Sequence, residues 1–205
     1  MGMQSAKLIV LEGPDGAGKS TVAIELVKRL KKEGIDAINL AFPGNSEGSL
    51  GELVYRLHHD SKSVGVNSIS PAAIQALHVA AHLDAIEDVI KPSINSGSTV
   101  VLDRYWWSTV VYGQFNGVNN EIISKLINIE KLYFDPLRPD YVFLLKREDT
   151  SNCVASADRN TLSSLYSRFI DDETFNYPVH EVSNNQSIQQ TVEDIWLIIS
   201  KNLAN

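Results

Sequence analysis

This chain of 205 residues contains one cysteine, Cys153, so no disulfide can form within it. Such a composition suits a reducing compartment, and we expect a cytoplasmic location. Long apolar runs are also missing, because none approaches the ~20 residues that a membrane-spanning helix requires. The first residues contain no apolar signal core. We therefore expect no membrane partner, and we assign no chemistry to Cys153, which has no paired histidine motif.

Positive charge is scarce as well. Lys and Arg together number 18 against 25 Asp and Glu, which gives a net charge of −7 at pH 7. Proteins that bind nucleic-acid polymers usually show a basic excess, so we expect no such partner. The length suits a single α/β domain over residues 1–205, and no internal repeat is visible.

Glycine and lysine are concentrated in one stretch near the N-terminus. An apolar run, Leu8–Leu11, precedes this stretch, and an amphipathic run, Val22–Leu30, follows it. The stretch reads Gly13-Pro14-Asp15-Gly16-Ala17-Gly18-Lys19-Ser20-Thr21. It matches the phosphate-loop pattern G-x-x-x-x-G-K-[ST] in its required context, after a strand and before a helix. The combination of strand, spacing and helix outweighs the alternative of a glycine-rich turn that happens to carry a lysine.

The spacing within this stretch has a physical reason. Glycines let the backbone curl, so that successive N–H groups point at phosphate oxygens. The helix that begins near Ser20 adds the positive end of its dipole. Lys19 supplies a mobile cation for the outer phosphates, and the Ser20 hydroxyl can bind Mg²⁺. The stretch therefore predicts a site for nucleotide phosphates.

Apolar and amphipathic segments alternate along the rest of the chain. We expect strands at 7–11, 35–40, 99–102, 141–145 and 179–182, and helices at 20–33, 50–59, 71–90, 107–114, 121–133, 161–172 and after the capping box at 187–190. The helix that begins at Ser70-Pro71 should stop before Pro92, and residues 60–69 should form a loop. The alternation predicts a three-layer α/β fold of the P-loop NTPase type, with a mainly parallel five-stranded sheet and helices on both faces.

Ligands of such a sheet bind at the carboxyl ends of the strands. Four loops are expected at that edge: 13–20, 41–48, 103–105 and 146–160. Asp103 follows an apolar strand there, and its carboxylate can hold Mg²⁺ near the bound phosphates. The alternative is an aspartate that caps the next helix. Arg104 suits a second phosphate, because a guanidinium forms two parallel hydrogen bonds, and the alternative for it is a surface ion pair.

Several motifs occur in a characteristic order. They are Gly13–Ser20, Phe42-Pro43, Val101–Tyr105 with Ser108, Tyr112-Gly113, and Pro139-Asp140 before a strand. Over nearly the full length, the chain resembles the thymidylate kinase family of P-loop nucleoside monophosphate kinases. The phosphate loop is specific only to a superfamily, whereas the stretch from Asp103 to Gly113 points to this family.

The resemblance implies ATP as phosphate donor, Mg²⁺ as the metal, dTMP as acceptor with dTDP as product, and a homodimer formed through helices on one face of the sheet. It implies that Ser20 and Asp103 bind the metal. It also implies that Asn184 lies beside the adenine of ATP. The full set of implied ATP-binding positions is Gly13, Asp15, Gly16, Ala17, Gly18, Lys19, Ser20, Thr21 and Asn184.

On the acceptor side, the resemblance implies that Arg104 grips the phosphate, that Asp15 contacts the sugar hydroxyl, and that Tyr112 lies under the deoxyribose. The other acceptor positions are Phe42, Pro43, His78, His82, Asp103 and Ser108. Residues 146–160 match the lid that closes over ATP and excludes water. The positions implied in catalysis are Lys19, Asp15, Arg104 and Arg159.

The sequence departs from the family pattern in three places. The Phe-Pro loop reads Phe42-Pro43-Gly44-Asn45 and lacks the usual arginine. The positions that normally carry an aromatic residue and an arginine for the base are occupied by His78 and His82. Their alternative role is that of two partly buried, hydrogen-bonded histidines, and a zinc site is disfavoured because no Glu follows His78. The lid is poor in arginine, with Arg147 and Arg159 as candidates and Arg168 beyond it, and each could also be an ordinary surface residue.

Two other functions are compatible with the sequence. A deoxynucleoside kinase phosphorylates a sugar hydroxyl and needs a carboxylate base after the first strand, where Glu12 stands. The second is a regulatory module that binds nucleotide without catalysis. It is suggested by the arginine missing from the Phe-Pro loop and by the small number of arginines in the lid. Trp106 and Trp107 are expected to lie in the core and to support the loop that carries Arg104.

Overall fold

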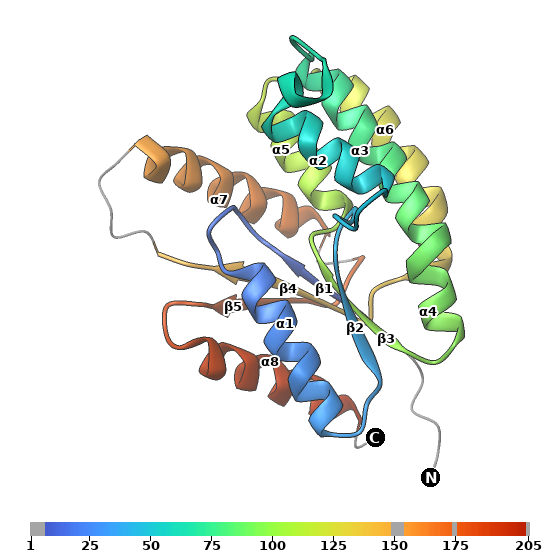
Figure 1. The fold of residues 1–205 in the computed structure, drawn as a ribbon. Coiled ribbons are helices and arrows are strands. Elements are labelled where there is room, and N and C mark those ends of the chain that lie inside the picture. The colour runs from blue at the N-terminus through green and yellow to red at the C-terminus, as the bar shows by residue number, and fades with distance from the viewer. Residues whose placement is uncertain (1–6, 149–153, 174–175, 204–205) are drawn as a thin grey trace.

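The computed structural model describes residues 7–148, 154–173 and 176–203 (Figure 1). Its centre is a five-stranded sheet in the order β2-β3-β1-β4-β5, in which all four strand pairs are parallel. The strands are β1 (Leu8–Glu12), β2 (Ala37–Ala41), β3 (Thr99–Asp103), β4 (Tyr141–Lys146) and β5 (Val179–Ser183). The predicted parallel α/β fold is therefore confirmed.

Helices cover both faces of the sheet, as Figure 1 shows. Helices α1 (Lys19–Lys32) and α8 (Ile188–Leu203) pack on one face, where alternate strand residues such as Ile9 and Leu11 point. The opposite face, with Leu8 and Val10, packs against the remaining large helices. These include α5 (Trp106–Phe115), α6 (Asn120–Phe134) and α7 (Val154–Glu173). No described helix is long and apolar enough to cross a membrane.

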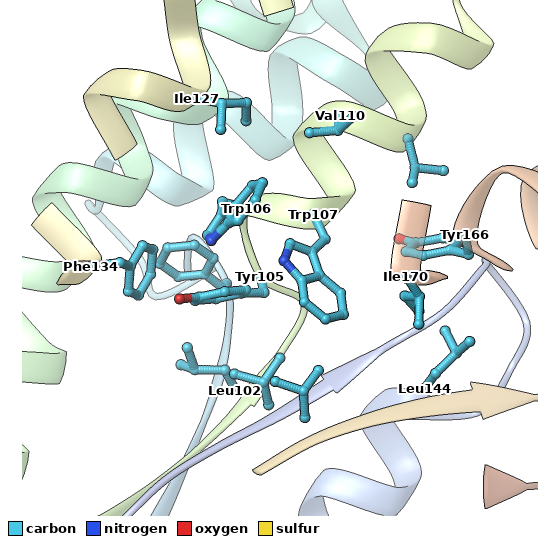
Figure 2. Close-up of a cluster of buried hydrophobic side chains, with 14 of the residues drawn as sticks. Leu102, Tyr105, Trp106, Trp107, Val110, Ile127, Phe134, Leu144, Tyr166 and Ile170 are labelled. Atoms are coloured by element: carbon cyan, nitrogen blue, oxygen red, sulfur yellow. The ribbon is translucent and has the colours of Figure 1, made fainter. Parts of the chain in front are cut away.

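An aromatic cluster fixes the chain just after β3. Tyr105, Trp106 and Trp107 are at most 1% exposed, and Figure 2 shows their side chains between Leu102 of the sheet and Ile127 of α6. Burial of large aromatic side chains dominates the local packing energy. The expected core position of the two tryptophans is confirmed, and their packing anchors Asp103 and Arg104 immediately before them.

The prediction that the helix stops before Pro92 is wrong. Helix α3 (Pro71–Ala85) continues through a π-helical turn, η2 (Ile86–Ile90), into α4 (Lys91–Asn95). Pro92 lies in the first turn of α4. The π turn accommodates the proline, because Lys91 N donates to the carbonyl oxygen of Ile86 and the hydrogen-bond register is shifted just before the residue that lacks an N–H.

Two expected loops are partly helical. Within residues 60–69, η1 (Ser61–Val64) is a 3₁₀ helix that follows α2 (Leu50–His59), and the Asp60 carboxylate caps it by accepting from Ser63 N at 3.3 Å. Helix α7 begins at Val154, seven positions before the predicted start, so residues 154–160 of the expected lid are helical. A further 3₁₀ turn, η3 (Asp135–Leu137), follows α6. Cys153 lies outside the described residues.

Candidate active site

The loop between β1 and α1 has the conformation that its glycines permit. Gly13, Gly16 and Gly18 have φ values of +140°, +80° and +91°. A Cβ atom on Gly13 would lie 2.5 Å from the carbonyl oxygen of Leu145 on β4, and one on Gly18 would overlap the side chain of Asn184. Because these neighbours are held within the fold, both positions require glycine.

Lys19 is the first residue of α1 and is only 5% exposed. Its Nζ donates to the carbonyl oxygen of Pro14 at 2.9 Å, so the ammonium group lies over the loop. Burial and, after it, the charge of Arg104 lower the pKa of Lys19 to about 8, although the neighbouring carboxylates oppose this shift. The loop surrounds a cavity of about 200 Å³, whose lining is Asp15, Gly16, Gly18, Lys19, Ser20, Thr21, Asp103 and Arg104.

Ser20 and Asp103 meet on one side of this cavity. The Ser20 hydroxyl donates to Asp103 Oδ2, while Oδ1 has no hydrogen-bond partner among the described residues. Asp103 is 6% exposed, and a buried carboxylate oxygen without a partner is a suitable ligand for a hard cation. Within the described ranges, no cluster of three or more His, Cys, Asp or Glu could hold a metal by itself. A cation here would therefore share its remaining ligands with phosphate and water.

Asn184 supports the phosphate loop from beneath. Its Nδ2 donates to the carbonyl oxygen of Ala17 at 2.7 Å, and its Oδ1 accepts from Thr191 Oγ1 at 2.8 Å. Asn184 and Thr191 are both buried. The side chain that was expected beside an adenine is thus engaged in holding the loop, and sequence analysis gave no signal for Thr191 as its partner.

Glu12 is the hub of a buried network behind the loop. It is 0% exposed and accepts from Tyr105 N at 2.8 Å, Ser108 N at 3.1 Å and Tyr166 OH at 3.0 Å. Burial raises the pKa of Glu12, although the charges of Arg104 and Lys19 oppose this shift. Glu12 thereby fixes the start of α5. Nothing in the sequence signalled that Tyr166, more than 150 positions away, would be part of this network.

Arg104 occupies a strained position, with a φ of +85° that non-glycine residues rarely adopt. Its guanidinium pairs with Asp15 Oδ1, donates to Ser108 Oγ at 3.2 Å, and lies 5.1 Å from the centre of the Tyr112 ring. Tyr112 OH in turn donates to Asp15 Oδ2 at 2.7 Å. Burial acts to raise the pKa of Asp15, but Arg104 and Tyr112 outweigh it and the net shift is downward. The structure thus brings together four predicted acceptor residues.

A second cavity of about 480 Å³ opens on the far side of Arg104. It shares Asp15, Ser20, Asp103 and Arg104 with the smaller cavity, so the two spaces meet at these residues. The rest of its lining is Ala41, Phe42, Pro43, Gly44, Asn45, Gly51, Tyr55, His58, His59, Gln75, His78, His82, Ser108, Thr109 and Tyr112. The predicted Phe-Pro loop and both predicted histidines therefore face the same space as Arg104.

Histidines form the wall opposite Arg104. Phe42 stacks on His82 with ring centroids 4.0 Å apart, and the Nδ1 atom of His82 contacts the carboxylate of Glu130. His78 Nε2 lies 3.0 Å from His58 Nδ1, within hydrogen-bond distance. Burial, followed by the charge of His82, lowers the pKa of His78 to about 3, so this ring is neutral. Sequence analysis missed Glu130 and His58, which come from other helices and match no motif.

One of the three candidate lid arginines, Arg159, lies beside the loop. A Cβ atom placed on Gly16 would be 3.1 Å from Arg159 Nη2, so the guanidinium lies beside Gly16. Arg147 and Arg168 are exposed, and none of the three arginines is part of the lining of either cavity. Asn45 lines the larger cavity at the place where an arginine was missing from the Phe-Pro loop.

Known proteins are similar to this chain in sequence. A family model described as thymidylate kinase matches residues 11–195. The thymidylate kinase of Pelodictyon phaeoclathratiforme is 34% identical over 142 residues, which cover 69% of this chain and 61% of that protein. That of Chlamydia trachomatis serovar L2 is 37% identical over 138 residues, covering 67% and 64%. The matched region thus spans less than two thirds of these curated relatives.

A solved structure agrees with the fold. The crystal structure of thymidylate kinase from Ehrlichia chaffeensis superposes with a TM-score of 0.76 at 18% identity, covering 96% of this chain and all of that one. This likeness supports the parallel sheet and its helices. The sequence comparison shows the family as well as the fold, because the family model matches nine tenths of the chain. The chain belongs to the thymidylate kinase family.

Proposed function

We propose that this protein transfers the γ-phosphoryl group of ATP to the phosphate of dTMP, giving ADP and dTDP. The observation that carries the proposal is the meeting of two cavities at Asp15, Ser20, Asp103 and Arg104. One cavity has a phosphate loop, and the other has an arginine at its mouth. Transfer in line between two bound nucleotides requires this alignment more than it requires a general base.

The donor phosphates bind in the smaller cavity. Six residues of the loop line it, namely Asp15, Gly16, Gly18, Lys19, Ser20 and Thr21, and backbone N–H groups of such a loop bind phosphate oxygens. Lys19 moves from Pro14 to the outer phosphates, where its charge stabilises the transferring group. Asn184 keeps the loop in its binding conformation through Ala17.

Ser20 and Asp103 are the residues that would hold Mg²⁺. The unpartnered Oδ1 of Asp103 and the adjacent Ser20 hydroxyl fit an oxygen-binding cation. When bound, the ion supplies neutralisation of phosphate charge. Asp103 and Ser20 are already oriented by their mutual hydrogen bond, so little reorganisation is needed for them to act as ligands.

The acceptor binds in the larger cavity, with its phosphate on Arg104. Ser108 orients this guanidinium at 3.2 Å, and Asp15 exchanges its contact with Arg104 for one with the sugar hydroxyl. Tyr112 lies under the deoxyribose, where its ring leaves no space for a 2′-hydroxyl. The base extends toward Phe42, Pro43, His78 and His82, which line the far wall.

We assign Arg159 the role of the lid arginine, within the lid segment of about 146–160. Its guanidinium lies beside Gly16, which lines the smaller cavity. A cation at this place compensates for the arginine that the Phe-Pro loop lacks. Lid closure would bring it onto the transferring group and exclude water.

The geometry disfavours a deoxynucleoside kinase. Such an enzyme needs an accessible carboxylate base, but Glu12 is 0% exposed and accepts hydrogen bonds from Tyr105, Ser108 and Tyr166. It cannot reach a nucleoside in either cavity without breaking this network. The other alternative, a regulatory module without catalysis, is distinguished from an enzyme by an activity assay.

The first test is an ADP-release assay with ATP, Mg²⁺ and a panel of nucleoside and deoxynucleoside monophosphates. We expect release that depends on dTMP, with little release for ribonucleotides because of Tyr112. Thymidine offered in place of dTMP should give none. ATP binding without acceptor-dependent release would support the regulatory module instead, and release with thymidine would support the nucleoside kinase.

A second prediction concerns pH. The pKa of Lys19 in the free protein is about 8, so at pH 9 the ammonium has largely lost its proton, whereas phosphate binds the charged form. ATP binding above pH 8 must therefore take up a proton, and affinity falls as pH rises. We expect the Kd for ATP to increase about tenfold between pH 7 and pH 9.

Calorimetric titration measures this change in Kd. The matched control is Lys19→Ala, whose weaker binding of ATP should not depend on pH in that range. A constant Kd in the unsubstituted protein would contradict the assignment.

We further propose a homodimer in the cytoplasm. Helix α6 presents Ile122, Ile129 and Leu132 to solvent, with Leu132 as much as 74% exposed. A row of exposed apolar side chains on one helix is typical of a surface that another protein covers.

A further inference from the structure

We propose that the hydroxyl group of Tyr166, on helix α7, positions the Arg104 guanidinium for the acceptor phosphate by holding Ser108. This inference rests on the proposed function, because it concerns the phosphate of the acceptor. Tyr166 is a positioning residue: it lines neither cavity, whereas Ser108 and Arg104 both line the larger one. Its hydroxyl group therefore acts on Arg104 from behind the wall of the acceptor cavity.

Tyr166 carries a polar group at a position where packing requires none. It is 1% exposed, and its ring belongs to the buried cluster drawn in Figure 2. Phenylalanine would fill nearly the same space, and a buried hydroxyl group is costly unless it is hydrogen-bonded. The hydroxyl group of Tyr166 has two partners, Ser108 Oγ at 2.9 Å and Glu12 Oε2 at 3.0 Å. Burial, followed by the charge of Glu12, raises the pKa of Tyr166 well above its usual value, so the hydroxyl group keeps its proton at neutral pH.

Ser108 connects this hydroxyl group to Arg104. Its Oγ atom lies 3.2 Å from Arg104 Nη1 and 3.0 Å from Glu12 Oε2. Because a guanidinium has donors only, Ser108 Oγ accepts from Arg104, and the Ser108 proton is left for Glu12 or Tyr166. Whichever hydroxyl group donates in the bond between Ser108 and Tyr166, that bond ends at the oxygen to which Arg104 donates. The place of this oxygen therefore determines where Arg104 is held.

Glu12 does not fix this oxygen by itself. A serine side chain turns about a single bond, so its Oγ atom is held in one orientation only by the partners around it. The oxygens of Glu12 also accept from backbone N–H groups at the phosphate loop and at the start of α5. Tyr166 supplies the additional partner that keeps Ser108 Oγ beside Arg104. Without it, the Ser108 side chain is free to turn and Arg104 loses a fixed contact.

The same contact joins the acceptor side of the site to the lid. Tyr166 and Arg159 are seven positions apart on α7, close to two full turns, so they project from the same face of the helix. Leu162 and Ile170 of this face are buried as well. The face is thus held against the core at Tyr166, while its earlier part places Arg159 beside Gly16. One helix therefore supports the arginine that we assign to each of the two nucleotides.

The contribution of the acceptor phosphate can be measured with two ligands that differ only by it. Calorimetric titration without ATP gives the Kd of dTMP and the Kd of thymidine, and the ratio of the second to the first reports what the phosphate adds to affinity. In Tyr166→Phe we expect this ratio to fall about fivefold to tenfold, because Arg104 is no longer held, while the Kd of thymidine stays within about twofold. The matched control is Tyr133→Phe on α6, which lines neither cavity and should keep the original ratio.

A double-mutant cycle with Ser108→Ala tests the route through Ser108. This variant should itself lower the ratio, because Arg104 loses the oxygen to which it donates. Adding Tyr166→Phe should then change the ratio by less than about twofold, since the residue through which the hydroxyl group acts is gone. Losses that multiply would show that Tyr166 acts by another route, and they would overturn the inference.

A purely structural role for Tyr166 would weaken the binding of dTMP and thymidine by the same factor. That outcome, or an unchanged ratio, would overturn the inference. Should Tyr166→Phe fail to fold by circular dichroism, an unchanged ratio in Ser108→Ala would still overturn it.

These measurements require no turnover, so they separate this inference from the proposed function. The expected fall in the ratio, without ADP release from any monophosphate, would remove the proposed function and leave the role of Tyr166 intact. Turnover of dTMP with an unchanged ratio in Tyr166→Phe would remove only this inference. A lack of dTMP binding by the unsubstituted protein would overturn both.

Discussion

Replacing Lys19 with alanine is expected to lower kcat for ATP and dTMP by about a thousandfold or more. Lys19 lines the smaller cavity, which we propose for the donor; it is only 5% exposed, with Nζ 2.9 Å from the Pro14 carbonyl oxygen. In such a desolvated place a charge that stabilises the transition state contributes far more than it would in water. A coupled ADP-release assay at saturating concentrations of both substrates measures the loss.

The control for this prediction is Lys31→Ala. Lys31 lies in the last turn of the same helix, is exposed and is remote from both cavities. Its removal should leave kcat within about twofold of the original value, since exposed surface substitutions have small effects. Residual activity of Lys19→Ala near that of the control would show that the loop cation does not act on the transferring group.

The phosphate loop and the fold could be predicted because their signals are local. Gly13, Gly18 and Lys19 stand at fixed spacings between a strand and a helix, and each glycine has a conformational or steric reason that operates within a few residues. The alternation of apolar and amphipathic segments likewise predicts parallel strands, since consecutive parallel strands need crossover helices.

The supporting residues could not be predicted, because tertiary packing brings them together. Tyr166 reaches Glu12 across the core from α7, and Glu130 reaches His82 from α6. Neither pair has a spacing in the sequence that reveals it. Glu12 illustrates the consequence: its place after the first strand suggested a catalytic base, whereas its complete burial shows that it holds other residues in position.

Helix ends were the weakest part of the prediction for a similar reason. Pro92 normally marks the end of a helix, but here a π turn absorbs the disruption and packing of α3 on α6 extends the helical path. The polar sequence after Val154 resembles a loop, yet it is the first part of a helix whose later residues, including Tyr166, are buried. Tertiary contacts outweighed local composition at both places.

Replacing Arg104 with alanine is expected to reduce kcat/KM for dTMP about a hundredfold or more, with a much smaller change in KM for ATP. Its guanidinium lies between Asp15, Ser108 and Tyr112 at the mouth of the acceptor cavity, where two parallel hydrogen bonds to a phosphate can replace the contact with Asp15. Initial rates measured across both substrate concentrations separate the two effects. Equal losses for the two substrates, or unchanged acceptor kinetics, would refute the assigned role.

The backbone of Arg104 permits a sharper form of this experiment. At a φ of +85°, alanine is strained by about 1 kcal/mol, whereas glycine is not, so Arg104→Gly should be more stable to urea than Arg104→Ala by about that amount. Both variants lack the guanidinium, and they should therefore show the same loss in acceptor use. A glycine variant with normal acceptor kinetics would mean that relaxation of the strained backbone in the alanine variant, and not the missing charge, caused its defect. The exposed Arg56→Ala on α2 supplies the remaining control, with kinetics expected to match those of the unsubstituted protein.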